Sequence, residues 1–117
     1  MKVKRLVFGS TKDDKETATM LYRGFLLGGN IVNGNHAKGP EVTRRESRIL
    51  DKFDALGECD DENAVMNLYD EGGELVLDIP QFEMLKKYFN STPWTVRVSR
   101  KVEQIDDWLT NIQPEEG

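Results

Sequence analysis

The chain has 117 residues, of which 38% are hydrophobic and 32% are charged, and its net charge is −5. This length suits one hydrophobic core, so we expect residues 1–117 to form a single domain. The acidic balance disfavours non-specific binding to nucleic acids and to anionic membranes, because neutralised phosphates supply most of that affinity.

Cys59 is the only cysteine, so the chain cannot form an internal disulfide bond. An unpaired cysteine is typical of proteins in reducing compartments. The charged N-terminal segment is unlike a signal peptide, and no run approaches the roughly 18 apolar residues of a membrane span. We therefore expect a cytoplasmic protein that does not enter a membrane.

In chain order, the first predicted elements are a strand and a helix. Residues 3–8 are rich in β-branched and aromatic side chains, which is typical of a strand. An approximate capping box follows, formed either by Ser10 with Asp13 or by Thr11 with Asp14. The apolar residues after it recur at helical spacing, which predicts a helix.

Residues 28–40 are polar and rich in glycine. They predict that the first helix ends at their opening Gly-Gly pair and that a mobile loop follows. The clearest helix of the chain then covers 41–56, beginning at Pro40 or at a capping box formed by Thr43 with Glu46. It ends at Gly57.

The next part predicts an acidic connector and a hairpin. Residues 58–64 are mostly acidic, and 74–79 form the best strand pattern of the chain. We predict that 65–69 pairs with 74–79 through the Gly-Gly turn between them. The alternative is that 65–69 forms a short helix.

The last part predicts two helices around a strand. Asp78 and Pro80 begin a helix that ends before Pro93. Residues 94–98 alternate between apolar and polar side chains, which predicts a strand. Ser99 caps a final helix, and residues 114–117 predict a frayed tail. Together these elements predict an α+β fold, with three or four helices packed on a small, mainly antiparallel sheet.

Three surface features are candidates for binding a partner. Arg44, Arg48 and Lys52 follow at intervals of four residues, so they form one basic stripe along the 41–56 helix. Such a stripe is either a solvated face or a site for an acidic partner or a phosphate backbone. The other candidates are the apolar pair Ile31 and Val32, inside a polar stretch, and the tryptophan after the helix-breaking Pro93, Trp94.

The sequence contains no recognisable catalytic, cofactor or metal motif. The glycines of 28–40 lack the Lys-Ser/Thr ending of a phosphate-binding loop. His36 is the only histidine and has no ligands nearby in the sequence, and the pair of Cys59 and His36 has no local support as a nucleophile and base. The 21 acidic residues define no carboxylate pair by spacing. We therefore predict no cofactor and no metal.

Four short stretches carry a resemblance to a known group of proteins: Gly73–Leu77, Phe82–Lys87, Thr92–Trp94 and Asp107–Leu109. They resemble short uncharacterised accessory proteins encoded by tailed bacteriophages, over roughly the last 45 residues. The resemblance implies a regulator, a host-factor inhibitor or an assembly component that acts in the host cytoplasm. It implies no active-site residues.

Our main functional hypothesis is a non-enzymatic interaction module that binds a host or viral protein, or a second copy of itself. The contact would use the 28–40 region or the basic stripe. The first alternative is a nucleic-acid-binding protein that uses the arginine-rich helix 41–56. The second is an enzyme whose active site is assembled from scattered carboxylates.

Overall fold

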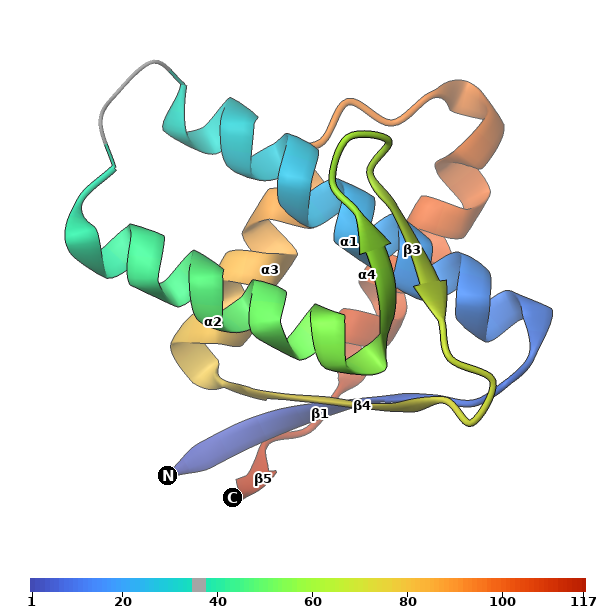
Figure 1. The fold of residues 1–117 in the computed structure, drawn as a ribbon, viewed down its shortest axis with the longest axis horizontal. Helices are drawn as coiled ribbons and strands as arrows, with labels where there is room; N and C mark the ends of the chain where they lie inside the picture. The colour runs from blue at the N-terminus through green and yellow to red at the C-terminus, as the bar shows by residue number, and fades with distance from the viewer. Residues whose placement is uncertain (35–37) are drawn as a thin grey trace.

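The structure is a computed structural model, and it describes residues 1–34 and 38–117. The α+β class is confirmed: four α-helices accompany two small antiparallel sheets in the described part of the chain (Figure 1). The elements in chain order are β1 (Lys2–Phe8), α1 (Lys12–Asn33), α2 (Pro40–Leu56), β2 (Gly57–Asp60), β3 (Val65–Leu68), β4 (Gly73–Asp78), α3 (Ile79–Ser91), the 3-10 helix η1 (Val96–Val98), α4 (Ser99–Asn111) and β5 (Glu115–Glu116).

The larger sheet has the order β4-β1-β5. β1 pairs antiparallel with β4 along its length, from Val3 opposite Asp78 to Phe8 opposite Gly73, whereas β5 pairs only with Lys2 and Val3. Side chains alternate between the two faces of a strand. One face of the sheet carries buried leucines and phenylalanine against the helices (Leu6, Phe8, Leu75, Leu77). On the other face, Arg5 forms ion pairs with Glu74 and Glu115.

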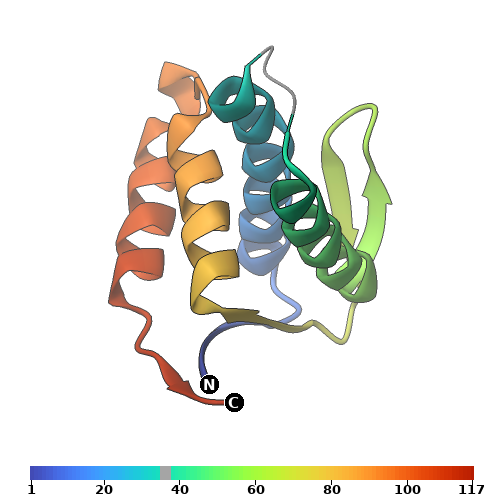
Figure 2. The same cartoon turned by 90° about the vertical axis from the view of Figure 1, so that its left-hand side faces the viewer.

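The helices cover one face of this sheet (Figure 2). In Figure 2, α4 and α2 lie on opposite sides of the pair formed by α1 and α3. The core between them is aromatic: Phe53 of α2 meets Tyr22 of α1 edge-on at a centroid distance of 5.3 Å, and Phe25 stacks on Tyr88 of α3 at 5.2 Å. No helix among the described residues is long and apolar enough to cross a membrane.

The predicted end of the first helix at Gly28-Gly29 is wrong. α1 continues to Asn33, and both glycines are buried inside it. The reason is a close approach of two helices: a methyl group at Gly28 would lie 1.7 Å from the carbonyl oxygen of Tyr88. The mobile loop predicted at 28–40 is therefore helical up to residue 33, and residues 35–37 lie outside the described part of the chain.

The predicted hairpin is wrong in its pairing. Residues 65–68 do form a strand, β3, but its partner is β2, with Cys59 opposite Met66, so part of the predicted acidic connector is also a strand. Gly57 makes this possible, because a methyl group there would lie 2.2 Å from the carbonyl oxygen of Asn67. The predicted partner, β4, pairs instead with β1.

Two predictions for the C-terminal part are also wrong. Residues 94–98 do not form a strand: Val96–Val98 is a 3-10 turn, and Val96 is 89% exposed, so the alternating apolar residues have no sheet to cover. The predicted frayed tail pairs with β1 as β5. The final helix does begin at Ser99, although the Ser99 side chain does not cap it.

Candidate functional site

Three arginines of α2 converge on the first turn of α3. Arg44 and Arg48 are exposed and Arg45 is half-buried, and none of the three forms an ion pair with a carboxylate in the described part of the chain. Together they line one side of a depression of about 200 Å³. Its other lining residues are Glu41, Asp78, Pro80 and Gln81.

Lys52, the third member of the predicted basic stripe, does not lie in this depression. Its ammonium group donates a hydrogen bond to the carbonyl oxygen of Val76 in β4 and another, 3.1 Å long, to Oε1 of Gln81. The long lysine side chain thus joins α2 to the sheet and to α3. The structure thus brings Arg44, Arg45 and Arg48 together in the depression and places Lys52 outside it.

An apolar groove continues from the arginines between α2 and α3. It has a volume of about 350 Å³ and shares Arg45 and Pro80 with the first depression. Apolar atoms dominate its wall, which also carries the charged side chains of Arg45, Glu83 and Lys87. The remaining lining residues are Val32, Asn33, Val42, Glu83, Met84, Lys87 and Tyr88. We call the groove and the arginine depression together the α2–α3 surface.

The structure separates the predicted pair Ile31 and Val32. Val32 lines the α2–α3 surface and packs against the core. Ile31, one residue before Val32 and so about 100° away around the helix, does not line the groove and is 58% exposed. Leu27, one turn earlier on α1, is the nearest exposed apolar residue on that helix at 41%.

A hydrogen-bond network closes one end of the groove. The Tyr88 hydroxyl donates to Oε2 of Glu46 at 2.8 Å, and the amide of Asn33 donates to the Tyr88 oxygen at 3.2 Å. Lys38 pairs with Oε1 of Glu46 at 3.0 Å. Burial raises the pKa of Tyr88 to about 12, so its hydroxyl stays protonated and donates. These contacts fix the end of α1 to α2 and α3, which gives the groove a rigid wall.

The Trp94 side chain contacts other residues of the protein rather than extending into solvent. Its indole N–H donates to the carbonyl oxygen of Phe89 at 3.0 Å, and its ring packs on the Phe89 ring at 5.1 Å. The ring also lies over Gly24 of α1. The side chain is half-buried and holds the turn after α3 against α1, so little of it is available as an exposed anchor.

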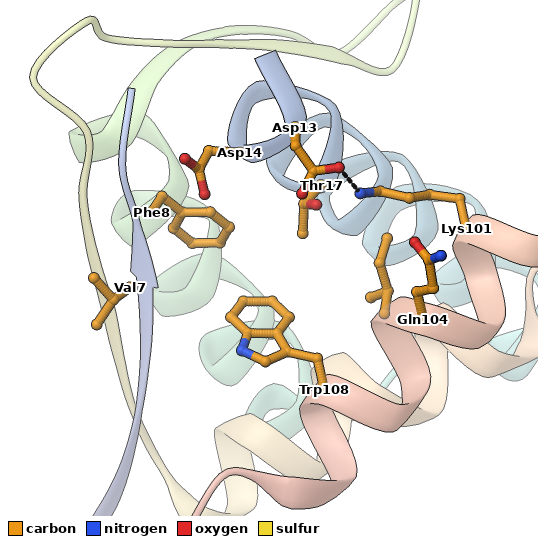
Figure 3. Close-up of a pocket in the computed structure, with 9 residues that line it drawn as sticks. Val7, Phe8, Asp13, Asp14, Thr17, Lys101, Gln104 and Trp108 are labelled. Carbon is orange, nitrogen blue, oxygen red and sulfur yellow. Dashed lines mark hydrogen bonds and ion pairs between the residues drawn. The ribbon is translucent and has the colours of Figure 1, made fainter. Parts of the chain in front are cut away.

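A second cavity lies on the other side of the molecule, between β1, the start of α1 and α4 (Figure 3). It has a volume of about 250 Å³. Phe8 and Trp108 meet edge-to-face there at 5.8 Å, and Lys101 pairs with Asp13. The Asp14 carboxylate accepts hydrogen bonds from the hydroxyl and the backbone N–H of Thr11 in the capping box of α1, and these bonds lower its pKa. A carboxyl group with a lowered pKa is ionised at neutral pH and cannot serve as a general acid there.

Cys59 lies half-buried in β2, beside Asp54 and Tyr22. Burial, and next the contact with Asp54, raise the pKa of its thiol to about 12. The suggested partner His36 lies outside the described residues. Among residues 1–34 and 38–117, no group of three His, Cys, Asp or Glu side chains could hold a metal ion.

We expect Cys59 to react with iodoacetamide at pH 8 about ten- to a hundredfold more slowly in the folded protein than in urea. The thiolate is the reactive form, and a raised pKa leaves less of it. Mass spectrometry of timed samples measures the rate. Asp54→Asn should accelerate the folded-state reaction, whereas Asp51→Asn, an equal charge change at an exposed site of α2, should not. Equal rates in folded and unfolded chains would contradict the assignment.

Comparison with known protein families, curated protein sequences and solved structures finds no match to this chain.

Proposed function

We propose that the protein is a non-enzymatic interaction module, and that its α2–α3 surface binds an acidic, partly apolar segment of a partner protein. The observation that carries the proposal is the convergence of Arg44, Arg45 and Arg48 in a depression that adjoins an apolar groove. None of the three is paired with a carboxylate in the described residues. Neither feature alone would distinguish a binding surface from an ordinary solvated helix.

The chemistry of the surface defines the partner segment. Guanidinium groups bind carboxylates through two parallel hydrogen bonds, which gives geometric specificity as well as affinity. The adjoining groove is lined by Val32, Val42 and Met84 and favours apolar side chains by removing them from water. An amphipathic segment with a carboxylate next to one or two apolar residues fits both parts.

A protein partner fits this surface better than a nucleic acid does. Glu41 and Asp78 line the arginine depression, and Glu83 lines the groove. These carboxylates would repel successive phosphates of a nucleic-acid backbone, and the whole chain carries a charge of −5. A protein segment needs to place only one carboxylate among the three arginines, so the repulsion from Glu41 and Asp78 acts on one charge rather than on a row of phosphates.

The resemblance of the last 45 residues to short phage proteins suggests where the partner is found. We propose a partner encoded by a phage or by its bacterial host, met in the host cytoplasm. A second copy of this chain is the other protein partner we would test, because its own acidic surface could supply the carboxylates.

The test is affinity capture with three forms of the full chain, followed by mass spectrometry. The forms are the wild type, a triple variant of the candidate arginines (Arg44→Glu, Arg45→Glu, Arg48→Glu), and a charge-matched control at exposed sites elsewhere (Lys12→Glu, Arg97→Glu, Arg100→Glu). We expect one partner to be retained by the wild type and the control and lost by the triple variant, with at least about tenfold weaker binding in titration of the purified pair.

Two results would overturn the proposal. The first is a partner that binds the triple variant and the wild type equally. The second is binding that disappears after nuclease treatment, which would assign the arginines to a nucleic acid. Circular dichroism of each variant establishes that it is folded before binding is compared.

A further inference from the structure

One edge of β1 is only partly covered. β5 pairs with β1 at Lys2 and Val3, and no strand of the described residues continues along this edge. Backbone N–H and C=O groups of a strand point alternately to its two edges. The Met1 carbonyl accepts a hydrogen bond from the Gly117 N–H on the β5 side, so Arg5 and Val7 direct their backbone groups to the same side, beyond the end of β5.

Even-numbered residues of β1 direct their backbone groups to the other edge, as Phe8 at the end of the strand shows. The carbonyl of Phe8 points to the β4 side, because a methyl group at Gly72 would lie 2.2 Å from its oxygen. Phe8 therefore pairs with β4, and Arg5 and Val7 do not use their backbone groups there. Unpaired strand edges of this kind accept an added strand, and a charged side chain such as Arg5 discourages pairing with a second copy.

The second cavity lies directly beside this open edge. Figure 3 shows Phe8 of β1 and Trp108 of α4 facing the space between the two elements, while Val7 points away from it. Ile105 and Gln104 of α4 complete the wall next to Trp108, and Asp13 and Asp14 lie at the end where α1 begins. The cavity thus has an apolar part near the edge and an end that carries Asp13, Asp14 and Lys101, with a net negative charge.

The edge and the cavity together define one occupant. A strand added next to β1 places alternate side chains on the helix side of the sheet, where the cavity takes one of them. The apolar wall formed by Phe8, Ile105 and Trp108 favours an apolar side chain. Asp13 and Asp14 share one cation of the cavity lining, Lys101, which pairs with Asp13 and whose charge also acts on Asp14. This end of the cavity therefore keeps a net negative charge and favours a cation.

We propose that the open edge of β1 is a second binding site, which adds an extended segment of a partner protein as a strand beside Arg5–Phe8. An apolar side chain of that segment enters the cavity between β1 and α4, and a lysine or arginine two residues away, on the same face of the added strand, lies near Asp13 and Asp14. Main-chain hydrogen bonds supply affinity in such complexes, and the pocket supplies selectivity.

This site is separate from the α2–α3 surface, since α4 and α2 lie on opposite sides of the α1–α3 pair (Figure 2). It also prefers the opposite charge. The protein would therefore bind an acidic segment on one side and a basic, extended segment on the other. A variant that abolishes binding at one site should leave binding at the other site unchanged, so the two proposals can be tested separately.

The test pans a displayed library of random twelve-residue peptides on the full chain and measures the enriched peptide by fluorescence polarisation. We expect a short consensus that combines apolar and basic residues. Val7→Pro should weaken its binding at least about tenfold, because proline removes the N–H at the open edge and leaves the ladder to β4 in place. Arg45→Glu, on the α2–α3 surface, should leave its binding unchanged.

A second pair of variants keeps the test decisive if Val7→Pro is unstable. Asp13→Lys should weaken binding of the basic peptide, whereas Glu16→Lys, the same charge change at an exposed α1 position outside the cavity, should not. In ¹⁵N-labelled protein, the peptide should shift the amide signals of Arg5 and Val7 and the indole signal of Trp108.

Each contrary result counts against the site. Failure to enrich any peptide overturns the proposal, as does a peptide that binds Val7→Pro and Asp13→Lys as tightly as wild type. A peptide lost only in Arg45→Glu would support the α2–α3 surface and refute the edge. Pairing of two β1 edges, seen as a dimer that Val7→Pro converts to monomer, would show that a second copy is the occupant and would refute the basic segment.

Discussion

Replacing Gly28 with alanine is expected to lower the free energy of unfolding by about 3 kcal/mol or more. The new methyl group would lie 1.7 Å from the carbonyl oxygen of Tyr88, 2.4 Å from its carbonyl carbon and 2.8 Å from its Cα atom. Carbon and oxygen atoms approach to only about 3.3 Å even in favourable C–H···O contacts. Backbone atoms cannot rotate away, so α1 and α3 would have to separate.

The sign of this prediction is opposite to that expected from helix propensity. In the interior of an isolated helix, alanine is about 1 kcal/mol more favourable than glycine, so a Gly28 exposed in a helix would make the variant more stable. Urea denaturation followed by circular dichroism at 222 nm measures the difference. Asn30→Ala, at an exposed position of α1, is the matched control and should stabilise the protein by a few tenths of a kcal/mol.

A stabilised Gly28→Ala protein would show that α1 and α3 do not approach as closely as the structure has them. Gly29 provides a graded comparison. A methyl group there would meet the Tyr88 ring at 3.0 Å and 3.2 Å, and a ring can shift slightly. Gly29→Ala should therefore be clearly less destabilising than Gly28→Ala.

Local signals in the sequence predicted most elements because each was decided by neighbouring residues. The capping box of Thr11 and Asp14 begins α1. The helix predicted at 41–56 begins at Pro40, the first of its two predicted starts, and Gly57 caps its end as predicted. Asp78 caps α3, with Pro80 in its first turn. At all of these positions the controlling contacts lie within four residues along the chain.

The errors arose where distant contacts override local signals. A Gly-Gly pair ordinarily ends a helix, but at 28–29 the glycines accommodate α3, which is more than fifty residues away in the sequence. The turn after residue 69 suits a hairpin, yet β4 pairs with β1 at the start of the chain. Strand pairing depends on which surfaces remain to be buried, and spacing within one segment carries no information about that.

The candidate site could be predicted only in part, because helical spacing is a local signal and the contacts between α2, β4 and α3 are not. Helical spacing correctly placed Arg44 and Arg48 on one face, and it also placed Lys52 there. It could not show that the Lys52 ammonium reaches Val76 and Gln81, nor that the first turn of α3 lies beside Arg45. The cavity between β1 and α4 joins residues about 100 positions apart, such as Phe8 and Trp108, and no local pattern indicates it.

Phe53→Ala is expected to lower the free energy of unfolding by about 3–5 kcal/mol. Phe53 is fully buried and is the residue through which α2 contacts the aromatic side chains of α1: Tyr22 edge-on at 5.3 Å and Phe25 at 6.2 Å. Its removal leaves a cavity between helices that cannot close without moving α2. Chemical denaturation measures the loss, and Asp51→Ala, exposed on the same helix, should stay within about 0.5 kcal/mol of wild type.

Phe53→Ala also tests how far the α2–α3 surface depends on the packing of α2 against the core. α2 is joined to the rest of the protein mainly by Ile49, Phe53 and Leu56, with Lys52 and Glu46 as polar ties. Weakening the apolar contact should make α2 open locally before the whole protein unfolds, so its amide hydrogens should exchange faster than those of α1 and α3. Uniform acceleration in all helices would mean that α2 unfolds only with the whole protein.

Local opening of α2 would displace Arg44, Arg45 and Arg48 from the first turn of α3 while leaving the β1 edge unchanged. Phe53→Ala should therefore weaken binding at the arginines and leave binding at the β1 edge unchanged.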